Sequence, residues 1–145
     1  MGPLKGLKVL DLSRILSGPF CTMVLADMGA DVVKIEEPGQ GDPARGSGPF
    51  IDGESSYFMS LNRGKKSITL DLARTEGRDL LLRLVEKADV LVENFRPGTM
   101  EKFGLEYKIL ESRNPRLIHV SITGFGHAGP YALRPALDVI IQGMG

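Results

Sequence analysis

Short apolar runs alternate along this chain with longer segments in which apolar residues recur at helical spacing. The strand-like runs cover residues 8–11, 31–35, 67–70, 89–93 and 117–122. Segments of helical character separate most of them, and this alternation is typical of a parallel sheet with helices on both faces. We therefore expect an α/β fold built on an open, mainly parallel sheet.

The helices can be placed from their first and last residues. A helix should begin at Pro19, after a Ser-Gly-Pro turn, and end at Gly29. A second helix should follow Thr75 as its N-cap, and two short helices should cover residues 97–103 and 107–113. The buried stripe predicted for the second helix consists of Leu80, Leu81, Leu82, Leu84, Val85 and Ala88.

Two segments rich in glycine and proline should be loops. Residues 37–53 hold too many such residues for a regular element, and a long loop is either functional or a simple cover. Residues 124–129 match the spacing G-x-G-x-x-G, but Pro130 and Pro135 interrupt the helix that would receive a pyrophosphate. We therefore expect a tight loop at the carboxyl end of a strand, without a nicotinamide or flavin site. The apolar run 139–141 looks like the start of another helix.

Composition narrows the class of protein. The 145 residues are 42% apolar and 25% charged, which suits one globular domain. Eighteen basic and eighteen acidic residues leave no excess of positive charge, so we expect no nucleic-acid partner. The start lacks a secretory signal and no run is long enough to cross a membrane, which favours the cytoplasm, or a mitochondrion or peroxisome in a eukaryote. Cys21 is alone and fits core packing.

Candidate chemistry lies where strands begin and end. Arg63, Lys65 and Lys66 precede a strand and could hold phosphates, although a solvated turn before an edge strand is favoured. Asn94, Phe95 and Arg96 follow a buried strand, so an amide, an aromatic face and a guanidinium gather at the carboxyl edge of the sheet. A ligand with a planar base and phosphates would suit that set.

The remaining polar candidates have simpler interpretations. Glu93 should accept hydrogen bonds from backbone donors, and His119 should be a packed strand histidine with its ring hydrogen-bonded. His127 could act as an acid or base but has no sequence partner to orient it. No Cys/His cluster has metal spacing and no Gly-x-Ser-x-Gly turn is present, so we expect neither a metal site nor serine hydrolysis.

Five segments together resemble the family III CoA transferases, the group of formyl-CoA and carnitine CoA transferases and α-methylacyl-CoA racemases. The matching segments are residues 10–20, 28–42, 61–72, 88–98 and 114–124, within a resemblance that covers about residues 4–143. It implies that residues 1–145 are the N-terminal part of a Rossmann-like, CoA-binding domain. It also implies that CoA or acyl-CoA is a substrate beside a carboxylic acid, with no tightly bound cofactor, in an interlocked homodimer.

The same resemblance implies roles for individual residues. Ile15 and Leu16 would line the entrance to the CoA site, and Leu70, Asp71, Leu72 and Ala73 would border the adenosine. Asn94, Phe95 and Arg96 would contact the nucleotide and pantetheine, and Lys102 would meet the phosphates. Pro135, Ala136, Leu137 and Asp138 would lie beside the pantetheine arm.

The family's transferases use an aspartate that attacks the acyl-CoA thioester, and by resemblance this aspartate lies beyond Gly145. No catalytic residue is then expected in this chain, and the chain alone should be inactive. Racemases of the family carry a histidine where this sequence has Leu137, which disfavours racemisation. Formyl-CoA transferases carry a glutamine where this chain has Leu16, which weakens a formate or oxalate substrate. A carnitine-like, a dicarboxylic or an aromatic acid then remains as the substrate, and the sequence does not choose among them. The alternatives to a CoA transferase are a racemase of the same family or a non-catalytic CoA- or nucleotide-binding module.

Overall fold

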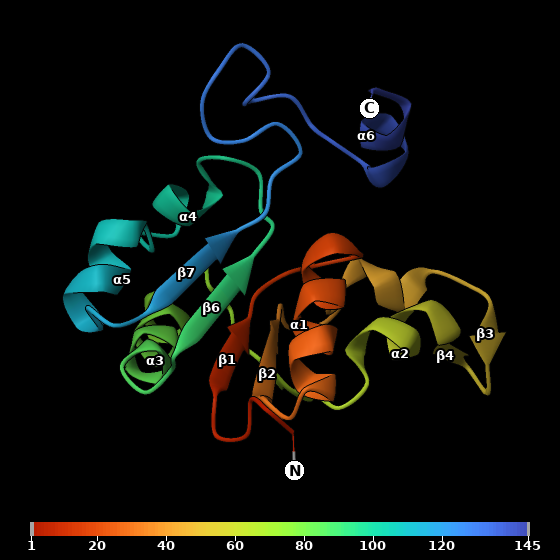
Figure 1. Ribbon diagram of the computed structural model, residues 1–145, viewed down its shortest axis with the longest axis horizontal. Helices are drawn as coiled ribbons and strands as arrows, with labels where there is room; N and C mark the ends of the chain where they lie inside the picture. The colour runs from red at the N-terminus through yellow and green to blue at the C-terminus, as the bar shows by residue number, and fades with distance from the viewer. Residues whose placement is uncertain (1, 145) are drawn as a thin grey trace.

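The computed structural model describes residues 2–144 and places five parallel strands in one sheet (Figure 1). The strands are β1 (Lys8–Asp11), β2 (Asp31–Glu36), β5 (Lys66–Thr69), β6 (Val90–Glu93) and β7 (Ile118–Ser121). Their order is β5-β2-β1-β6-β7, and all four neighbouring pairs are parallel. Numbered within the sheet alone, this order is 3-2-1-4-5, as in Rossmann-like domains. The expected α/β fold is confirmed.

Helices lie on both faces of the sheet. α1 (Ser17–Asp27) connects β1 to β2, and α3 (Thr75–Val85) connects β5 to β6. α4 (Thr99–Lys102) and α5 (Tyr107–Arg113) connect β6 to β7, and α6 (Asp138–Met144) follows β7. Figure 1 shows α1 in front of the strands and α3 behind them.

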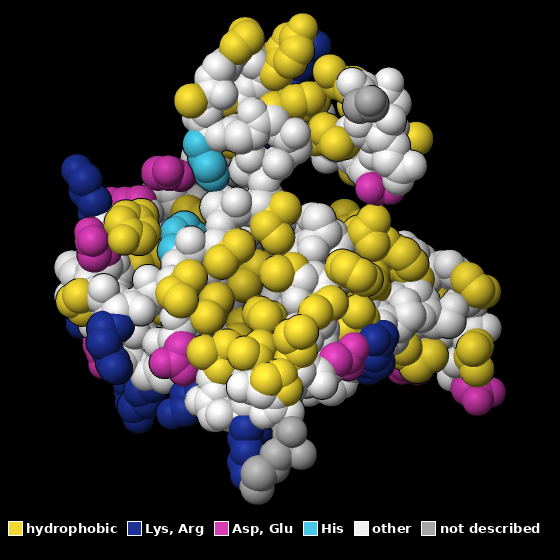
Figure 2. Space-filling view, viewed as in Figure 1, with side chains coloured by type: hydrophobic (Ala, Val, Ile, Leu, Met, Phe, Trp, Pro, Cys, Tyr) yellow, Lys and Arg dark blue, Asp and Glu magenta, His cyan; other side chains and the backbone are white. Residues whose placement is uncertain are grey.

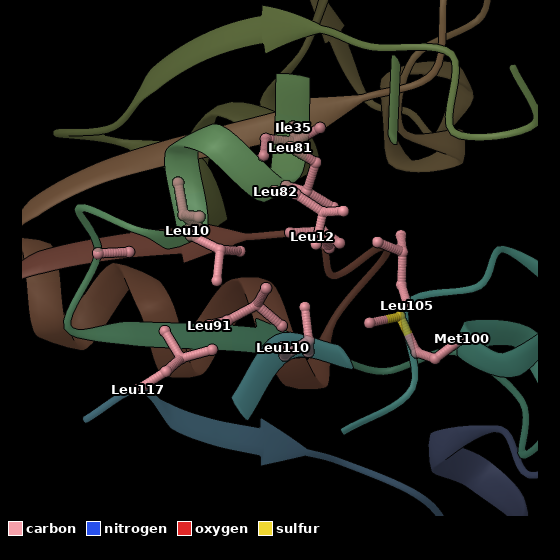
Figure 3. Close-up of a cluster of buried hydrophobic side chains, with 12 residues drawn as sticks. Leu10, Leu12, Ile35, Leu81, Leu82, Leu91, Met100, Leu105, Leu110 and Leu117 are labelled. Carbon is pink, nitrogen blue, oxygen red and sulfur yellow. The ribbon is translucent and has the colours of Figure 1, made fainter. Parts of the chain in front are cut away.

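Alternating residues of the strands divide the core into two layers. Leu10 and Leu91 pack with Leu81, Val85 and other residues on the α3 and α5 side (Figure 3). The neighbouring strand residues Val9, Val32, Val90 and Val92 pack with Leu25 on the α1 side. Because successive side chains of a strand point to opposite faces, one short apolar run supplies both layers.

Several element boundaries differ from the prediction. α1 begins at Ser17, before Pro19, and Thr75 is the first residue of α3, with Arg74 at the N-cap. Leu80, predicted in the buried stripe of α3, is 45% exposed because it lies on the outer side of the helix. The predicted long loop contains a short 3-10 helix, η1 (Pro43–Gly46), and the strand β3 (Phe50–Ile51).

The sequence did not predict the elements that follow this loop. β4 (Glu54–Ser55) pairs with β3, and α2 (Ser56–Asn62) packs against α1. The Ser55 hydroxyl accepts a hydrogen bond from the Phe58 amide and caps α2. Residues 42–45, which precede β3, fold back over the end of β2 and help to build the site.

The chain after β7 is far more exposed than the sheet. α6 has no buried residue, and in Figure 1 it stands apart from the strands. Figure 2 shows apolar side chains gathered over the face in front of β1 and β6. Ile118 on this face is 59% exposed, because no helix of residues 2–144 covers β7 there as α1 covers β1 and β2.

Candidate functional site

The site lies where the order of the strands reverses. The chain builds β1, β2 and β5 in one direction and then crosses back to add β6 and β7 beside β1. Ligands of open α/β sheets bind in the crevice outside the carboxyl ends of the strands at such a point. Here the segment after β1, residues 12–16, and the segment after β6, residues 94–96, lie side by side at that edge.

A cavity of about 100 Å³ opens at this edge. Arg14, Glu37 and Phe95 line it from the ends of β1, β2 and β6. Leu70, Asp71, Leu72 and Ala73 line it from the end of β5, and Phe103 closes it from α4. The Phe95 and Phe103 rings meet edge to face, with centroids 6.1 Å apart. The cavity therefore combines aromatic faces, one guanidinium and carboxylates.

Asn94 ties the segment after β1 to the end of β6. Its Oδ1 accepts a hydrogen bond from the Arg14 amide at 2.8 Å, and its Nδ2 donates to the Arg14 carbonyl at 2.8 Å. The same Nδ2 donates to the Ser17 hydroxyl at 3.2 Å. Both polar groups of the Asn94 side chain are thus engaged by the protein itself.

Ile15 adopts an unusual backbone conformation beside this contact. Its φ is 68°, a left-handed value that β-branched residues rarely adopt. Its amide donates to Asp42 Oδ1 at 3.0 Å, and the Leu16 amide turns back to the Arg14 carbonyl at 3.0 Å. Tertiary hydrogen bonds therefore hold Ile15 in a conformation that its own side chain disfavours.

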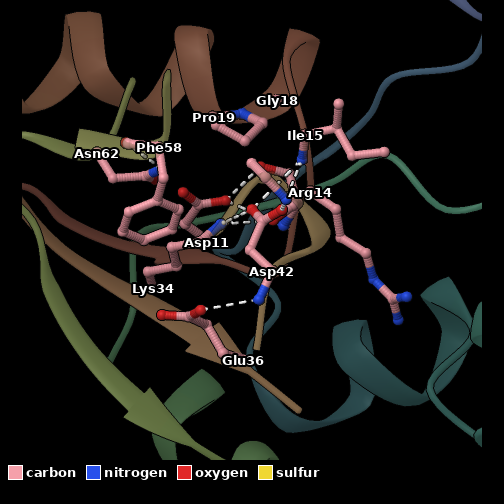
Figure 4. Close-up of polar contacts among 12 residues, drawn as sticks. Asp11, Arg14, Ile15, Gly18, Pro19, Lys34, Glu36, Asp42, Phe58 and Asn62 are labelled. Atoms are coloured by element: carbon pink, nitrogen blue, oxygen red, sulfur yellow. Dashed lines mark hydrogen bonds and ion pairs between the residues drawn. The ribbon is translucent and has the colours of Figure 1, made fainter. Parts of the chain in front are cut away.

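A cluster of buried charges supports this segment from below (Figure 4). Lys34 and Asp42 form an ion pair at 2.8 Å with both side chains 1% exposed, and Lys34 Nζ also donates to the Ser13 carbonyl. Lys65 pairs with Asp11 at 2.9 Å. Asp11 also accepts hydrogen bonds from the Ser13 and Thr22 hydroxyls. We call these four residues, Asp11, Lys34, Asp42 and Lys65, the buried charge cluster.

The charges set the protonation of the cluster. Burial would raise the pKa of Asp11, but the positive charges of Lys34 and Lys65 and two hydroxyl donors lower it overall. Burial lowers the pKa of Lys65, and the Asp11 carboxylate opposes this only in part. Asp11 is therefore held as a carboxylate, an acceptor for the groups around it.

Glu36 anchors the far side of the same network. Its carboxylate accepts hydrogen bonds from Arg45 at 2.8 and 2.9 Å, from the Asp42 amide and from the Ser67 hydroxyl. Burial raises its pKa, but these donors and the Arg45 charge outweigh that and lower the pKa to about 2. This bond set fixes residues 42–45 against β2 and so positions Asp42.

Gly18 lets α1 begin at this point. A Cβ at position 18 would overlap the Ser13 side chain, so any larger residue would push the start of α1 away from the end of β1. The close approach also places the Thr22 hydroxyl 2.6 Å from Asp11.

A second cavity, of about 260 Å³, lies on the other side of Phe95. Arg96, Tyr107, His119 and His127 line it. Burial lowers the pKa of His119, whose Nε2 has no hydrogen-bond partner among residues 2–144 and lies 3.8 Å from Glu93 Oε1. The prediction of a hydrogen-bonded ring is therefore not met at Nε2 within residues 2–144, and the Tyr107 ring stacks on the face of the imidazole. His127 Nε2 lies 2.9 Å from the Ser121 hydroxyl.

The comparison with known families agrees with this geometry. A sequence profile of CoA-transferase family III matches residues 4–145. The chain belongs to CoA-transferase family III.

Individual relatives cover nearly all of this chain but only part of their own length. An acetyl-CoA:oxalate CoA-transferase from Acetobacter aceti is 51% identical, over 99% of this chain and 37% of that protein. A succinyl-CoA:mesaconate CoA-transferase from Haloarcula hispanica is 52% identical, over 100% of this chain and 39% of that protein. The crystal structure of a CAIB/BAIF family protein from Brucella suis superimposes with a TM-score of 0.94 at 52% identity, over 99% of this chain and 39% of that one. The chain thus spans about two fifths of these relatives.

The structure brings together some of the residues that the family resemblance singled out. Residues 70–73 and Phe95 line the first cavity, whereas Arg96 lines the second. Ile15 and Leu16 lie between Asp42 and the start of α1, and Asn94 is bonded to the backbone of Arg14. Lys102 ends α4 and lines neither cavity.

Residues 135–138 lie apart from both cavities. Pro135, Leu137 and Asp138 are exposed, and Ala136 lies against Gly124. Asp138 begins α6, and its charge, after burial, helps to raise the pKa of Tyr57 in α2.

The residues around β5 and β6 only partly match the predictions from the sequence. Glu93 accepts a hydrogen bond from the Phe95 amide at 2.7 Å, as predicted. β5 is the edge strand, as predicted, but the turn before it is only partly solvated. Arg63 and Lys66 pair with Asp27 and Asp31 at the surface, whereas the Lys65 side chain is 2% exposed.

Sequence reasoning missed Arg14 and the buried charge cluster. Asp11 and Lys34 were visible as charged residues within apolar strand runs, a pattern that signals buried pairing. Two kinds of feature are absent from residues 2–144. None of the helices described there is long and apolar enough to cross a bilayer, and no three metal-binding side chains there converge.

Proposed function

We propose that the complete protein transfers CoA from an acyl-CoA to a dicarboxylic acid, and that residues 1–145 form the N-terminal part of its CoA-binding domain. The observation that carries this proposal is the cavity at the strand reversal, lined by Phe95, Phe103 and residues 70–73. Aromatic faces next to strand-end backbone suit a planar base with a ribose. Membership of CoA-transferase family III supports CoA as the nucleotide.

The acceptor class is inferred from the relatives. Two proteins about half identical to this chain are named for oxalate and mesaconate, and both of these acids are dicarboxylic. We therefore propose a dicarboxylic acceptor and include oxalate, although Leu16 replaces the glutamine of formyl-CoA transferases. The proposed enzyme is a homodimer with interlocked subunits that acts in the cytoplasm.

The proposed chemistry follows from the family resemblance. An aspartate beyond Gly145 attacks the thioester carbonyl, the CoA thiolate leaves, and an acyl-aspartyl anhydride forms. The thiolate then attacks the aspartyl carbonyl of the anhydride, which releases the donor acid and leaves an aspartyl-CoA thioester. The acceptor carboxylate attacks this thioester and expels the thiolate, which attacks the acceptor's carbonyl and releases the aspartate. Residues 1–145 bind and orient CoA throughout.

Transfer assays with the complete protein test this proposal. With succinyl-CoA as donor, we expect new CoA thioesters of dicarboxylic acids such as oxalate, mesaconate or glutarate. Carnitine and aromatic monocarboxylic acids serve as comparison acceptors. Transfer to those acids alone would overturn the acceptor class, and absence of CoA binding in calorimetric titration would overturn the function.

The racemase alternative has its own test. Leu137 cannot move a proton, so the complete protein should incorporate no α-deuterium into a chiral 2-methylacyl-CoA in deuterated water. Incorporation far above the rate without enzyme would identify a racemase, with another residue as the base.

A further inference from the structure

Among the basic side chains around the first cavity, Arg14 differs in having no ion-pair partner within residues 2–144. Two basic residues line the cavity, Arg14 and Lys34. Lys34 is 1% exposed, and its ammonium is taken up by Asp42 and by the Ser13 carbonyl. Arg14 forms no ion pair with any of residues 2–144. The cavity therefore has one cation whose charge the described protein leaves uncompensated.

The Arg14 side chain is also held in place. Its guanidinium carbon lies 4.8 Å from the centre of the Phe95 ring, within the range of a cation–π contact. In Figure 4 the side chain points away from the buried charge cluster, so its charge is directed outward. A stacked guanidinium keeps its N–H groups free at the edge, where an anion can take two parallel hydrogen bonds.

We infer that Arg14 is a substrate-binding residue that holds a phosphate of CoA, and that Asn94 is a positioning residue that fixes Arg14 for this contact. This inference rests on the proposed function, because it names the contact that the CoA site makes with the anionic part of its ligand.

The two cations that the family resemblance assigned to CoA binding are less well placed than Arg14 to hold this phosphate. Arg96 faces the second cavity, on the other side of Phe95. Lys102 is exposed at the end of α4 and lines neither cavity. A phosphate of a nucleotide whose base lies against residues 70–73 and Phe95 would meet Arg14 within the same cavity.

The carboxylates of the cavity direct an anion toward Arg14. Glu37 and Asp71 line the wall formed by the ends of β2 and β5, opposite the Arg14 and Phe95 side. Like charges repel a phosphate there, whereas carboxylate oxygens accept hydrogen bonds from ribose hydroxyls. Glu36 is already saturated by Arg45, Ser67 and the Asp42 amide. The arrangement favours a sugar near the acids and a phosphate near Arg14.

Asn94 suits the positioning role because it has both a donor and an acceptor. It bonds the amide and the carbonyl of Arg14 at 2.8 Å each, across 80 residues of sequence. An aspartate at position 94 would keep the acceptor but lose the donor to the Arg14 carbonyl. With both bonds in place, the Cα of Arg14 is fixed relative to Phe95, which is the next residue after Asn94.

Calorimetric titration of the complete protein with CoA and with pantetheine, which lacks the nucleotide and all phosphates, tests the assignment. We expect R14Q to weaken CoA binding about tenfold or more, as for loss of a charge-assisted hydrogen bond, with pantetheine affinity unchanged. The CoA affinity of R14K should lie between those of R14Q and the unmodified protein, because lysine keeps the positive charge but lacks the planar guanidinium. R83Q, on the exposed face of α3, is the matched control and should bind CoA like the unmodified protein.

The positioning role needs a double-mutant cycle. N94A, or N94S if N94A folds poorly, should lower the preference for CoA over pantetheine about as much as R14Q does. In the R14Q background the same change should have almost no further effect on that preference. A purely structural role for Asn94 would instead weaken binding of both ligands equally, in both backgrounds.

The outcomes separate this inference from the proposed function. If the unmodified protein binds no CoA, the proposed function fails and the inference fails with it. If it binds CoA and R14Q binds equally well, only the inference fails. Equal losses for CoA and pantetheine in R14Q would also overturn it, because the contact would then not involve a phosphate.

Discussion

The segments that follow β1 and β7 leave the same edge of the sheet but are held in different ways. Residues 12–16 are fixed by backbone hydrogen bonds to the side chains of Asp42 and Asn94, and the buried charge cluster lies beneath them. Residues 122–144 contain a glycine-rich loop and then α6, in which no residue is buried. Ile118, at the start of β7, lies on the same face of the sheet as α1 but is 59% exposed, because α1 covers β1 and β2 and does not reach β7.

The difference shows how each region acquires a defined shape. After β1, charges and amides fix the backbone, even in the left-handed conformation of Ile15. After β7, the residues are apolar enough to pack, as in the run 139–141, yet none of the α6 residues is buried by residues 2–144. Residues 12–16 are held by polar bonds. Residues 122–144 would need burial of their apolar side chains to be held equally well, and this part of the chain does not provide it.

The largest expected effect comes from removing Asp42. D42A leaves the Lys34 ammonium buried without its partner and the Ile15 amide without its acceptor. We expect the free energy of unfolding to fall by about 3–5 kcal/mol, as measured by denaturant titration. D79A, on the exposed side of α3, is the control and should change it by less than about 0.5 kcal/mol. A loss below about 1 kcal/mol for D42A would show that the cluster does not stabilise this region.

Replacing Glu36 should have a smaller effect on the free energy of unfolding, and this effect should disappear in acid. Its pKa falls from 4.5 to about 2 on folding, so its contribution to stability is complete above pH 4.5 and is lost as the pH falls toward 2. E36Q cannot titrate, so the free energy of unfolding should fall by about 3 kcal/mol at pH 7 and show a flatter decline below pH 4.5. Unfolding curves between pH 2 and pH 7 measure this. D31N, which removes an exposed ion pair, should keep the slope of the unmodified protein.

The smallest effect is expected in α6. Val139 is 72% exposed, so V139A should change the free energy of unfolding of the 145-residue chain by less than about 0.5 kcal/mol. The matched change in the core, V9A, removes a side chain that is 1% exposed and should cost about 2 kcal/mol. Similar losses for the two variants would mean that α6 packs against the sheet in solution, and the contrast between the two regions would fail.

The sheet was predictable because each of its strands carries a local signal. The runs around Val9, Val32 and Val90 are apolar and β-branched, and the turns between elements hold glycine or proline. The fixed segment after β1 was not predictable, because its bonds join residues 27 and 80 positions apart. α2 was missed because its seven residues are too few to show helical periodicity next to a glycine-rich loop.

The site was predictable in part for the same reason. Asn94 and Phe95 could be placed at the carboxyl edge because β6 is an unambiguous strand. Their partner Arg14 belongs to another strand end, and only the order β2-β1-β6 brings the two together. The buried state of Lys65 also depends on Asp11, 54 residues earlier, so its local sequence suggested a solvated turn.

The bond between Arg14 and Asn94 also has a consequence for synthesis. β1 is among the first segments made, but Asn94 follows Arg14 by 80 residues. At translation rates of about 5–20 residues per second, the ribosome adds these 80 residues in roughly 4–16 s. During that interval β1 has no β6 to pair with, and Val9 and Leu10 lack one of their two neighbouring strands. The cavity therefore cannot assemble as the N-terminus emerges, and the earliest-made part of the site is completed only when β6 arrives.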